Sequence, residues 1–167
     1  YMGIGTNILG YCNKEVDNAV ISAIKTSNMS TLNCPQEVLL AEKLISMHKW
    51  AGMVKFARTG GEANAIAIRI ARAAAKKDCV AVCGYHGWHD WYLSANLNNS
   101  KSLDGLLLKG LNIEGVPKNL KNTTYTFNYN NIDQLKELVE TKNIGIIKME
   151  VMRNQEPKNN FLEEVRR

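Results

Sequence analysis

The chain has 167 residues, of which 45% are hydrophobic and 22% are charged, and this is the composition of an ordinary globular protein with enough residues for one domain's core. Its net charge is +5, but lysine and arginine are spread along the chain, which argues against a nucleic-acid partner and favours solvated basic faces. No signal peptide and no apolar run of membrane-spanning length is visible, so we expect a cytoplasmic protein without membrane association.

Apolar residues recur with helical and strand periods in alternation. In chain order, we predict helices over 14–27 and 35–49, a strand over 53–58, a helix over 61–77, strands over 79–84 and 123–127, a helix over 131–142 and a strand over 144–149. Strands separated by helices predict an α/β domain with a parallel sheet. The connection over 90–122 has little periodicity, and loops of that length usually serve a function or an interface.

The turn at residues 59–61 joins the predicted strand 53–58 to the predicted helix 61–77 through two consecutive glycines. Glycines allow unusual torsions and let a ligand approach the backbone amides closely. The unpaired N–H groups and the dipole at a helix start favour a phosphate or carboxylate, and the Thr59 hydroxyl can cap the helix or bind the same anion. Such junctions also occur in α/β proteins that bind nothing there, so the turn alone leaves both possibilities open.

A second loop, over 84–92, follows the apolar run 79–83 and is rich in aromatic residues and histidine. Ligands in open α/β sheets bind beyond the carboxyl ends of the strands. If the two strands are neighbours, this loop and the turn 59–61 open toward the same crevice.

Metal sites are not favoured by the sequence. His86, His89 and Asp90 are suitable ligand types, but they lack the helical His-Glu-x-x-His arrangement. The four cysteines, at positions 12, 34, 79 and 83, have neither zinc-knuckle nor redox CxxC spacing. We therefore expect no metal site and reduced thiols.

The two loops resemble the successive ligand loops of the class III pyridoxal-phosphate (PLP) aminotransferases, especially members similar to glutamate-1-semialdehyde aminomutase. The matching segments are Thr-Gly-Gly-Glu-Ala at 59–63 and Gly-Tyr-His-Gly at 84–87, and the segments at 5–11, 115–117, 129–130 and 150–152 resemble the family in the same order. The resemblance covers essentially the whole chain. It implies PLP-dependent transferase fold type I, the α/β, mostly parallel fold of aspartate aminotransferase, with an entry segment and helix over 1–34 and the N-terminal half of the large domain over 35–167.

The resemblance also implies which residues bind the cofactor. The backbone amides of Gly60 and Gly61, with Thr59, are expected to bind the PLP phosphate, and Tyr85 is expected to stack on the pyridine ring. The family more often has Ser-Gly-Thr at this turn, so Gly61 stands where a hydroxyl donor is usual. We expect the missing hydroxyl to weaken binding of the phosphate.

His86 and Glu150 are the catalytic candidates that the resemblance implies. His86 follows the stacking tyrosine and is expected to orient the ring or the substrate, while Glu150 is expected close to the cofactor at the end of a later strand. The family usually has proline after that glutamate, whereas this chain has Val151.

Two residues that PLP transamination requires have no counterpart among the 167 residues of this sequence. The chemistry needs a lysine that holds the cofactor as a Schiff base and an aspartate that keeps the pyridine nitrogen protonated. In the family both follow the segment that residues 161–166 resemble, and the chain starts at Tyr1 inside what resembles a running motif. We therefore expect an internal piece of a longer aminotransferase, catalytically incomplete by itself.

The function implied by the resemblance is that of a PLP-dependent transaminase or aminomutase. It would act on small-molecule amino donors and acceptors and form a homodimer at full length. The alternative is an incomplete remnant that only binds a phosphate ligand or pairs with a partner chain. A different phosphate-ligand α/β enzyme is a third possibility, although the turn 59–61 has neither P-loop nor dinucleotide-binding spacing.

Overall fold

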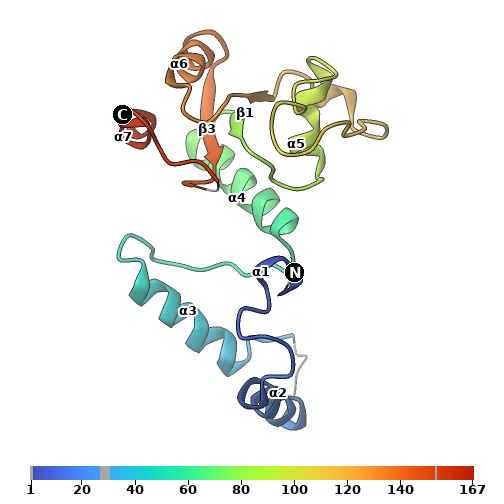
Figure 1. Ribbon diagram of the computed structural model, residues 1–167, viewed down its shortest axis with the longest axis vertical. Helices are drawn as coiled ribbons and strands as arrows, with labels where there is room; N and C mark the ends of the chain where they lie inside the picture. The colour runs from blue at the N-terminus through green and yellow to red at the C-terminus, as the bar shows by residue number, and fades with distance from the viewer. Residues whose placement is uncertain (1, 27–30, 153) are drawn as a thin grey trace. The chain divides into compact units, whose positions relative to one another are not determined.

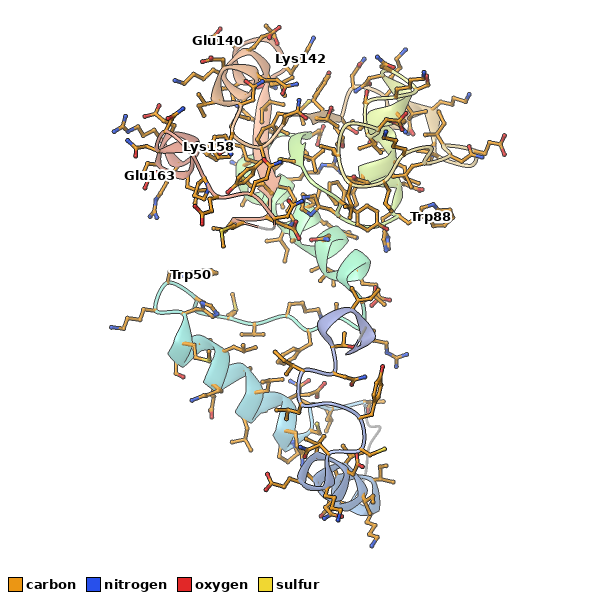
Figure 2. All side chains as sticks on the ribbon, viewed as in Figure 1. Trp50, Trp88, Glu140, Lys142, Lys158 and Glu163 are labelled. Atoms are coloured by element: carbon orange, nitrogen blue, oxygen red, sulfur yellow. The ribbon has the colours of Figure 1, made fainter. Side chains whose placement is uncertain are left out.

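The computed structural model describes residues 2–26, 31–152 and 154–167 (Figure 1). The chain divides into two compact units, Tyr1–Lys55 and Phe56–Arg167, which we call the N-terminal and C-terminal units and describe separately. Tyr1 and Ser27, which entered the sequence predictions, lie outside the described residues. The predicted domain boundary between residues 34 and 35 stays a prediction.

The N-terminal unit contains the turn α1 (Met2–Gly5) and two helices, α2 (Lys14–Thr26) and α3 (Pro35–Met47). The Asn13 side-chain oxygen accepts hydrogen bonds from two amides at the start of α2, each at 3.1 Å. Proline occupies the first turn of α3, and the Glu37 carboxylate accepts from the Cys34 amide at 2.9 Å. Both predicted helices are confirmed, although none of the residues described in them is buried.

The C-terminal unit is built on a parallel sheet with the strand order β2-β1-β3. Its elements are α4 (Gly60–Ala75), β1 (Cys79–Cys83), α5 (Asp90–Leu93), the 3-10 helices η1 (Ser94–Leu97) and η2 (Lys118–Leu120), β2 (Thr124–Thr126), α6 (Ile132–Thr141), β3 (Ile144–Met149) and α7 (Phe161–Arg166). In the middle of the sheet, Ala81 lies opposite Tyr125 of β2 and Ile147 of β3. The predicted α/β class with a parallel sheet is confirmed.

Alternate residues of β1 pack into two hydrophobic clusters on opposite faces of the sheet. Val80 and Val82 belong to one cluster, together with Ile68 of α4 and buried residues of the segment after β1. Ala81 and Cys83 belong to the other, together with residues of α6 and α7 (Figure 1). The central strand is thus covered on both sides, and this fixes the position of the loop that follows it.

The connection over 90–122 has a structural role that its low periodicity did not predict. Residues 91–96 are all buried, and the apolar ones, Trp91, Tyr92, Leu93 and Ala95, belong to the first cluster. Buried backbone groups of this connection that lack a partner within the short helices α5 and η1 need other hydrogen-bond partners, and polar side chains provide some of them. The Asn96 side chain donates to the Leu111 carbonyl at 3.2 Å and accepts from the Leu103 amide at 2.9 Å, while the Thr124 hydroxyl donates to the Trp91 carbonyl at 2.6 Å.

The strand predicted over 53–58 is wrong. This segment has no regular secondary structure, and every strand pairing among the described residues joins β1 to β2 or to β3. Met53 is 91% exposed, and the boundary between the two units falls at Lys55. A short apolar alternation forms a strand only where a neighbouring strand pairs with it, and no strand of the described residues pairs with this segment.

Candidate cofactor site

The start of α4 presents backbone amides that no protein group accepts. Thr59 is the N-cap, with extended torsions (φ −131°, ψ 158°), and its Oγ1 accepts from the Glu62 amide at 3.2 Å. The Glu62 carboxylate accepts from the Arg58 amide at 2.9 Å. Among the described residues, neither the Gly60 nor the Gly61 amide donates to an acceptor. Two N–H donors therefore remain for an anion.

The loop after β1 packs directly against this helix start. Gly84 and Gly87 have φ of +93° and +107°, a region that residues with a side chain rarely adopt. A Cβ on Gly87 would also lie 3.1 Å from the Gly61 Cα, so the close approach requires glycine. The Asn64 side-chain amide donates to the His86 carbonyl at 3.1 Å and ties α4 to the loop.

A hollow of about 650 Å³ lies where the turn 59–61 meets this loop, and we call it the helix-start pocket. Its lining includes Thr59, Gly61 and Tyr85, together with Ala65 and residues 87–91. Gly60 follows Thr59 directly, and a Cβ there would meet no atom within 4 Å. The structure therefore brings Thr59, Gly61 and Tyr85 into one pocket, with Gly60 adjacent in the chain, although the strand expected before the turn is not formed.

The Tyr85 ring forms part of the pocket wall, and Tyr92 holds it in place. The two rings meet edge to face, with centroids 5.9 Å apart and an interplanar angle of 86°. Tyr92 is 1% exposed, and its hydroxyl donates to the Gly84 carbonyl at 3.1 Å. Burial raises the pKa of Tyr92 well above its usual range, so the hydroxyl stays a neutral donor. Tyr85 is thus a supported, half-buried ring on the pocket wall, as a stacking residue must be.

His86 braces the loop from inside. The side chain is 4% exposed and its Nε2 lies 2.7 Å from the Cys83 carbonyl oxygen, to which the ring N–H donates. The imidazole also meets the Tyr92 ring edge to face, with centroids 6.2 Å apart. This position suits a residue that orients Tyr85 through the loop, and the catalytic role of His86 stays a prediction.

Glu150 lies in a second cavity, beyond the carboxyl ends of the three strands. This cavity of about 250 Å³ is lined by residues that follow each strand, among them Gly84 after β1, Tyr129 after β2 and Glu150 after β3. A Cβ on Gly84 would lie 3.7 Å from His86 Nε2 and 3.8 Å from Glu150 Oε2. The two catalytic candidates therefore both approach the same point beside Gly84.

The Glu150 carboxylate affects the pKa values of Cys83 and Lys148. Burial raises the pKa of the Cys83 thiol to about 11, and the nearby Glu150 carboxylate adds to this rise. Burial lowers the pKa of Lys148, and Glu150 opposes that change. The Tyr129 hydroxyl donates to the Val151 carbonyl and so fixes the backbone immediately after Glu150.

Three residues of the site were not predicted for the roles they have here. The sequence presents His89 only as a possible metal ligand, whereas in the structure its ring lies against Gly61. Tyr92 and Asn64 support the loop through contacts that bridge 8 and 22 positions of the chain. Sequence periodicity carries no signal for such contacts, because they depend on how the loop folds back onto α4.

Two negative findings concern the described part of the chain. Within it, no three histidine, cysteine, aspartate or glutamate side chains are grouped so as to hold a metal ion. No helix in the same ranges combines the length and apolar character needed to cross a bilayer.

Curated relatives match almost the whole chain. The 3-aminobutyryl-CoA aminotransferase of Cloacimonas acidaminovorans is 34% identical over 97% of this chain and 37% of its own length. The glutamate-1-semialdehyde 2,1-aminomutase of Sulfurisphaera tokodaii is 30% identical over 99% of this chain and 40% of its own length. No protein-family profile matches. The chain thus spans about two fifths of the length of these curated relatives.

Solved structures show the same fold. An ω-transaminase from Sphaerobacter thermophilus superposes on 94% of this chain with a TM-score of 0.77 and 22% identity, over 38% of its own chain. A glutamate-1-semialdehyde aminomutase from Pseudomonas aeruginosa covers 99% with a TM-score of 0.74 and 18% identity, over 36% of its own chain.

Proposed function

Because this chain belongs to the class III pyridoxal-phosphate-dependent aminotransferase family, we propose that the protein is a transaminase or aminomutase that binds PLP in the helix-start pocket. The observation that carries the proposal is the meeting of two unpaired helix-start amides, a hydroxyl and a supported tyrosine ring in one pocket. PLP carries a phosphate on a flat pyridine ring, so its phosphate can accept from the amides and the hydroxyl while its ring stacks on the tyrosine.

The residues present fit the cofactor's phosphate end. Gly60 and Gly61 carry no Cβ, so a phosphate oxygen can approach their amides closely. Thr59 Oγ1 accepts from Glu62, which leaves the hydroxyl proton to donate to the phosphate. When bound, PLP supplies the electron sink that stabilises negative charge at the amino-bearing carbon of the substrate. Tyr85 orients the ring by stacking.

In this proposal the two polar candidates act differently. His86 orients Tyr85 by bracing the loop, since its Nε2 is engaged by the Cys83 carbonyl. Glu150 faces the strand-end cavity and binds or orients the polar end of the substrate or cofactor there. The substrates are small-molecule amino donors and acceptors, and a cytoplasmic location rests on the sequence expectation alone.

We also propose that the working form is a homodimer. Apolar side chains recur along α2, and Val16, Val20 and Ile24 are 46%, 51% and 55% exposed. A second copy of the chain that covers this stripe would remove it from water. Light scattering tests the assembly, with Val20→Glu expected to shift the protein toward monomer and exposed Glu42→Gln on α3 as the control.

The proposed activity is tested on the product of the complete reading frame. The sequence encoded after Arg167 distinguishes the two functions. A strand with an aspartate, followed later by a lysine, indicates an enzyme, and their absence indicates a remnant that only binds a phosphate ligand. Incubation with PLP and a panel of amino donors and 2-oxo acceptors should then give measurable amino-group transfer. Absence of both PLP binding and transfer would refute the proposal.

A further inference from the structure

The His89 ring occupies the space where a side chain at Gly61 would stand. A Cβ on Gly61 would lie 2.8 Å from His89 Cδ2 and 2.9 Å from His89 Nε2. The Thr59 hydroxyl oxygen lies 3.9 Å from the same point. The imidazole therefore sits over the α-carbon at the second position of α4, beside the amides that remain unpaired.

His89 has no other polar engagement within the part of the chain that the structure describes. Its side chain makes no hydrogen bond there, and although His89 precedes α5 as its N-cap, its side chain does not cap that helix. The imidazole Nε2 lies beside Gly61, and both residues line the helix-start pocket. An imidazole with a proton on Nε2 is a hydrogen-bond donor.

We infer that His89 is a ligand of the PLP phosphate and supplies the side-chain donor that glycine at position 61 cannot. This inference rests on the proposed function. The His89 Nε2–H, the Thr59 hydroxyl and the amides of Gly60 and Gly61 would then all donate to the phosphate group. The Asp90 carboxylate also lines the pocket, so hydrogen-bond donors rather than net positive charge hold the anion.

Because the His89 ring lies where a side chain at position 61 would stand, exchanging which of the two positions carries a hydrogen-bond donor tests whether His89 donates to the phosphate. Gly61 does not have a positive φ, so the backbone accepts serine at this position. A serine side chain requires the space that the imidazole fills, and it brings a hydroxyl to that point. Gly61→Ser alone should disturb phosphate binding, whereas Gly61→Ser with His89→Ala should restore a donor without a clash.

The experiment compares PLP with pyridoxal, which lacks the phosphate. The apo form of the complete reading-frame product is titrated with each ligand, and tryptophan fluorescence reports binding, since Trp88 and Trp91 line the pocket. His89→Ala should raise the Kd for PLP about tenfold and change the Kd for pyridoxal less than about twofold. The double variant should bind PLP within about threefold of the wild type. His48→Ala, a histidine of the N-terminal unit, is the matched control and should change neither value.

The outcomes separate this inference from the proposed function. A wild-type protein that binds neither ligand refutes the proposed function and this inference with it. PLP binding that is unchanged in His89→Ala, or weakened equally for PLP and pyridoxal, overturns only the role of His89. A double variant that binds PLP no better than His89→Ala also contradicts a donor at this point.

Discussion

The side-chain amide of Asn64 donates to the backbone carbonyl of His86 across 3.1 Å, and this bond joins α4 to the loop that carries Tyr85. This hydrogen bond therefore links the two sides of the helix-start pocket. The relative position of the phosphate donors and the stacking ring therefore depends on a residue outside the pocket lining.

Replacing Asn64 by alanine should separate these halves. The variant leaves the partly buried His86 carbonyl without this donor, and we expect a loss of about 1 to 2 kcal/mol in the free energy of unfolding, together with weaker PLP binding. Urea unfolding and PLP titration measure the two effects. Asn119→Ala, at an exposed position whose side chain makes no hydrogen bond to a described residue, is the control. Equal stability of the two variants would contradict the prediction.

Tyr85→Ala should weaken PLP retention by about 1 kcal/mol or more, because ring stacking is lost. Tyr85→Phe keeps the ring and its edge-to-face contact with Tyr92, so it should retain most of the affinity. Titration of the apo protein with PLP gives both values. If Tyr85→Ala binds PLP as tightly as the wild type, Tyr85 does not contact the cofactor.

Gly60→Val should block the approach of the phosphate to the helix-start amides while the fold persists. A Cβ at Gly60 meets no atom within 4 Å and the residue lacks a positive φ, so the backbone accepts the change. We expect the Kd for PLP to rise by more than about tenfold, with an unchanged circular dichroism spectrum. Ala73→Val, at an exposed position of the same helix, should leave PLP binding intact. Normal uptake by Gly60→Val would place the phosphate elsewhere.

The Cys83 thiol should make folding stability fall with pH above 9. Burial, and next the charge of Glu150, raise the pKa of this thiol from 9.0 to about 11. Between these values the unfolded chain releases the proton and the folded chain keeps it, so the contribution is fully present below pH 9 and is lost as the pH rises toward 11. Urea midpoints of the wild type should fall more steeply over this range than those of Cys83→Ala. Glu150→Gln should reduce the steepness, and identical slopes in all three proteins would refute the assignment.

The sequence predicted those parts of the fold where local periodicity and packing agree. The helix predicted over 61–77 is α4, Gly60–Ala75, which ends before Lys76 in a left-handed conformation. The strand over 53–58 failed because pairing depends on a distant neighbour rather than on the apolar pattern. The buried segment 91–96 was missed for a related reason, since its pattern has no period and its groups bond to positions further along the chain, the Asn96 side chain to Leu103 and Leu111, and the Trp91 carbonyl to the Thr124 hydroxyl.

The candidate site could be predicted as two loops but not as a set of contacts. The glycines at 60, 61, 84 and 87 mark turns in the sequence, and the structure gives two of them positive φ. The sequence does not indicate that Gly61 and Gly87 touch, or that His89 fills the space above Gly61. These relationships arise from the folding of residues 84–89 onto α4, which no local pattern records.

The strand order β2-β1-β3 leaves β3 paired on one side only within the described residues. It is six residues long, twice the length of β2 at the opposite edge, and Ile147 is 37% exposed. Its outer edge presents backbone N–H and C=O groups, and an extended segment of another chain can form β-sheet hydrogen bonds with them. Turbidity of concentrated solutions should therefore grow with time through β-sheet extension, and a gatekeeper charge such as Ile147→Lys should delay it.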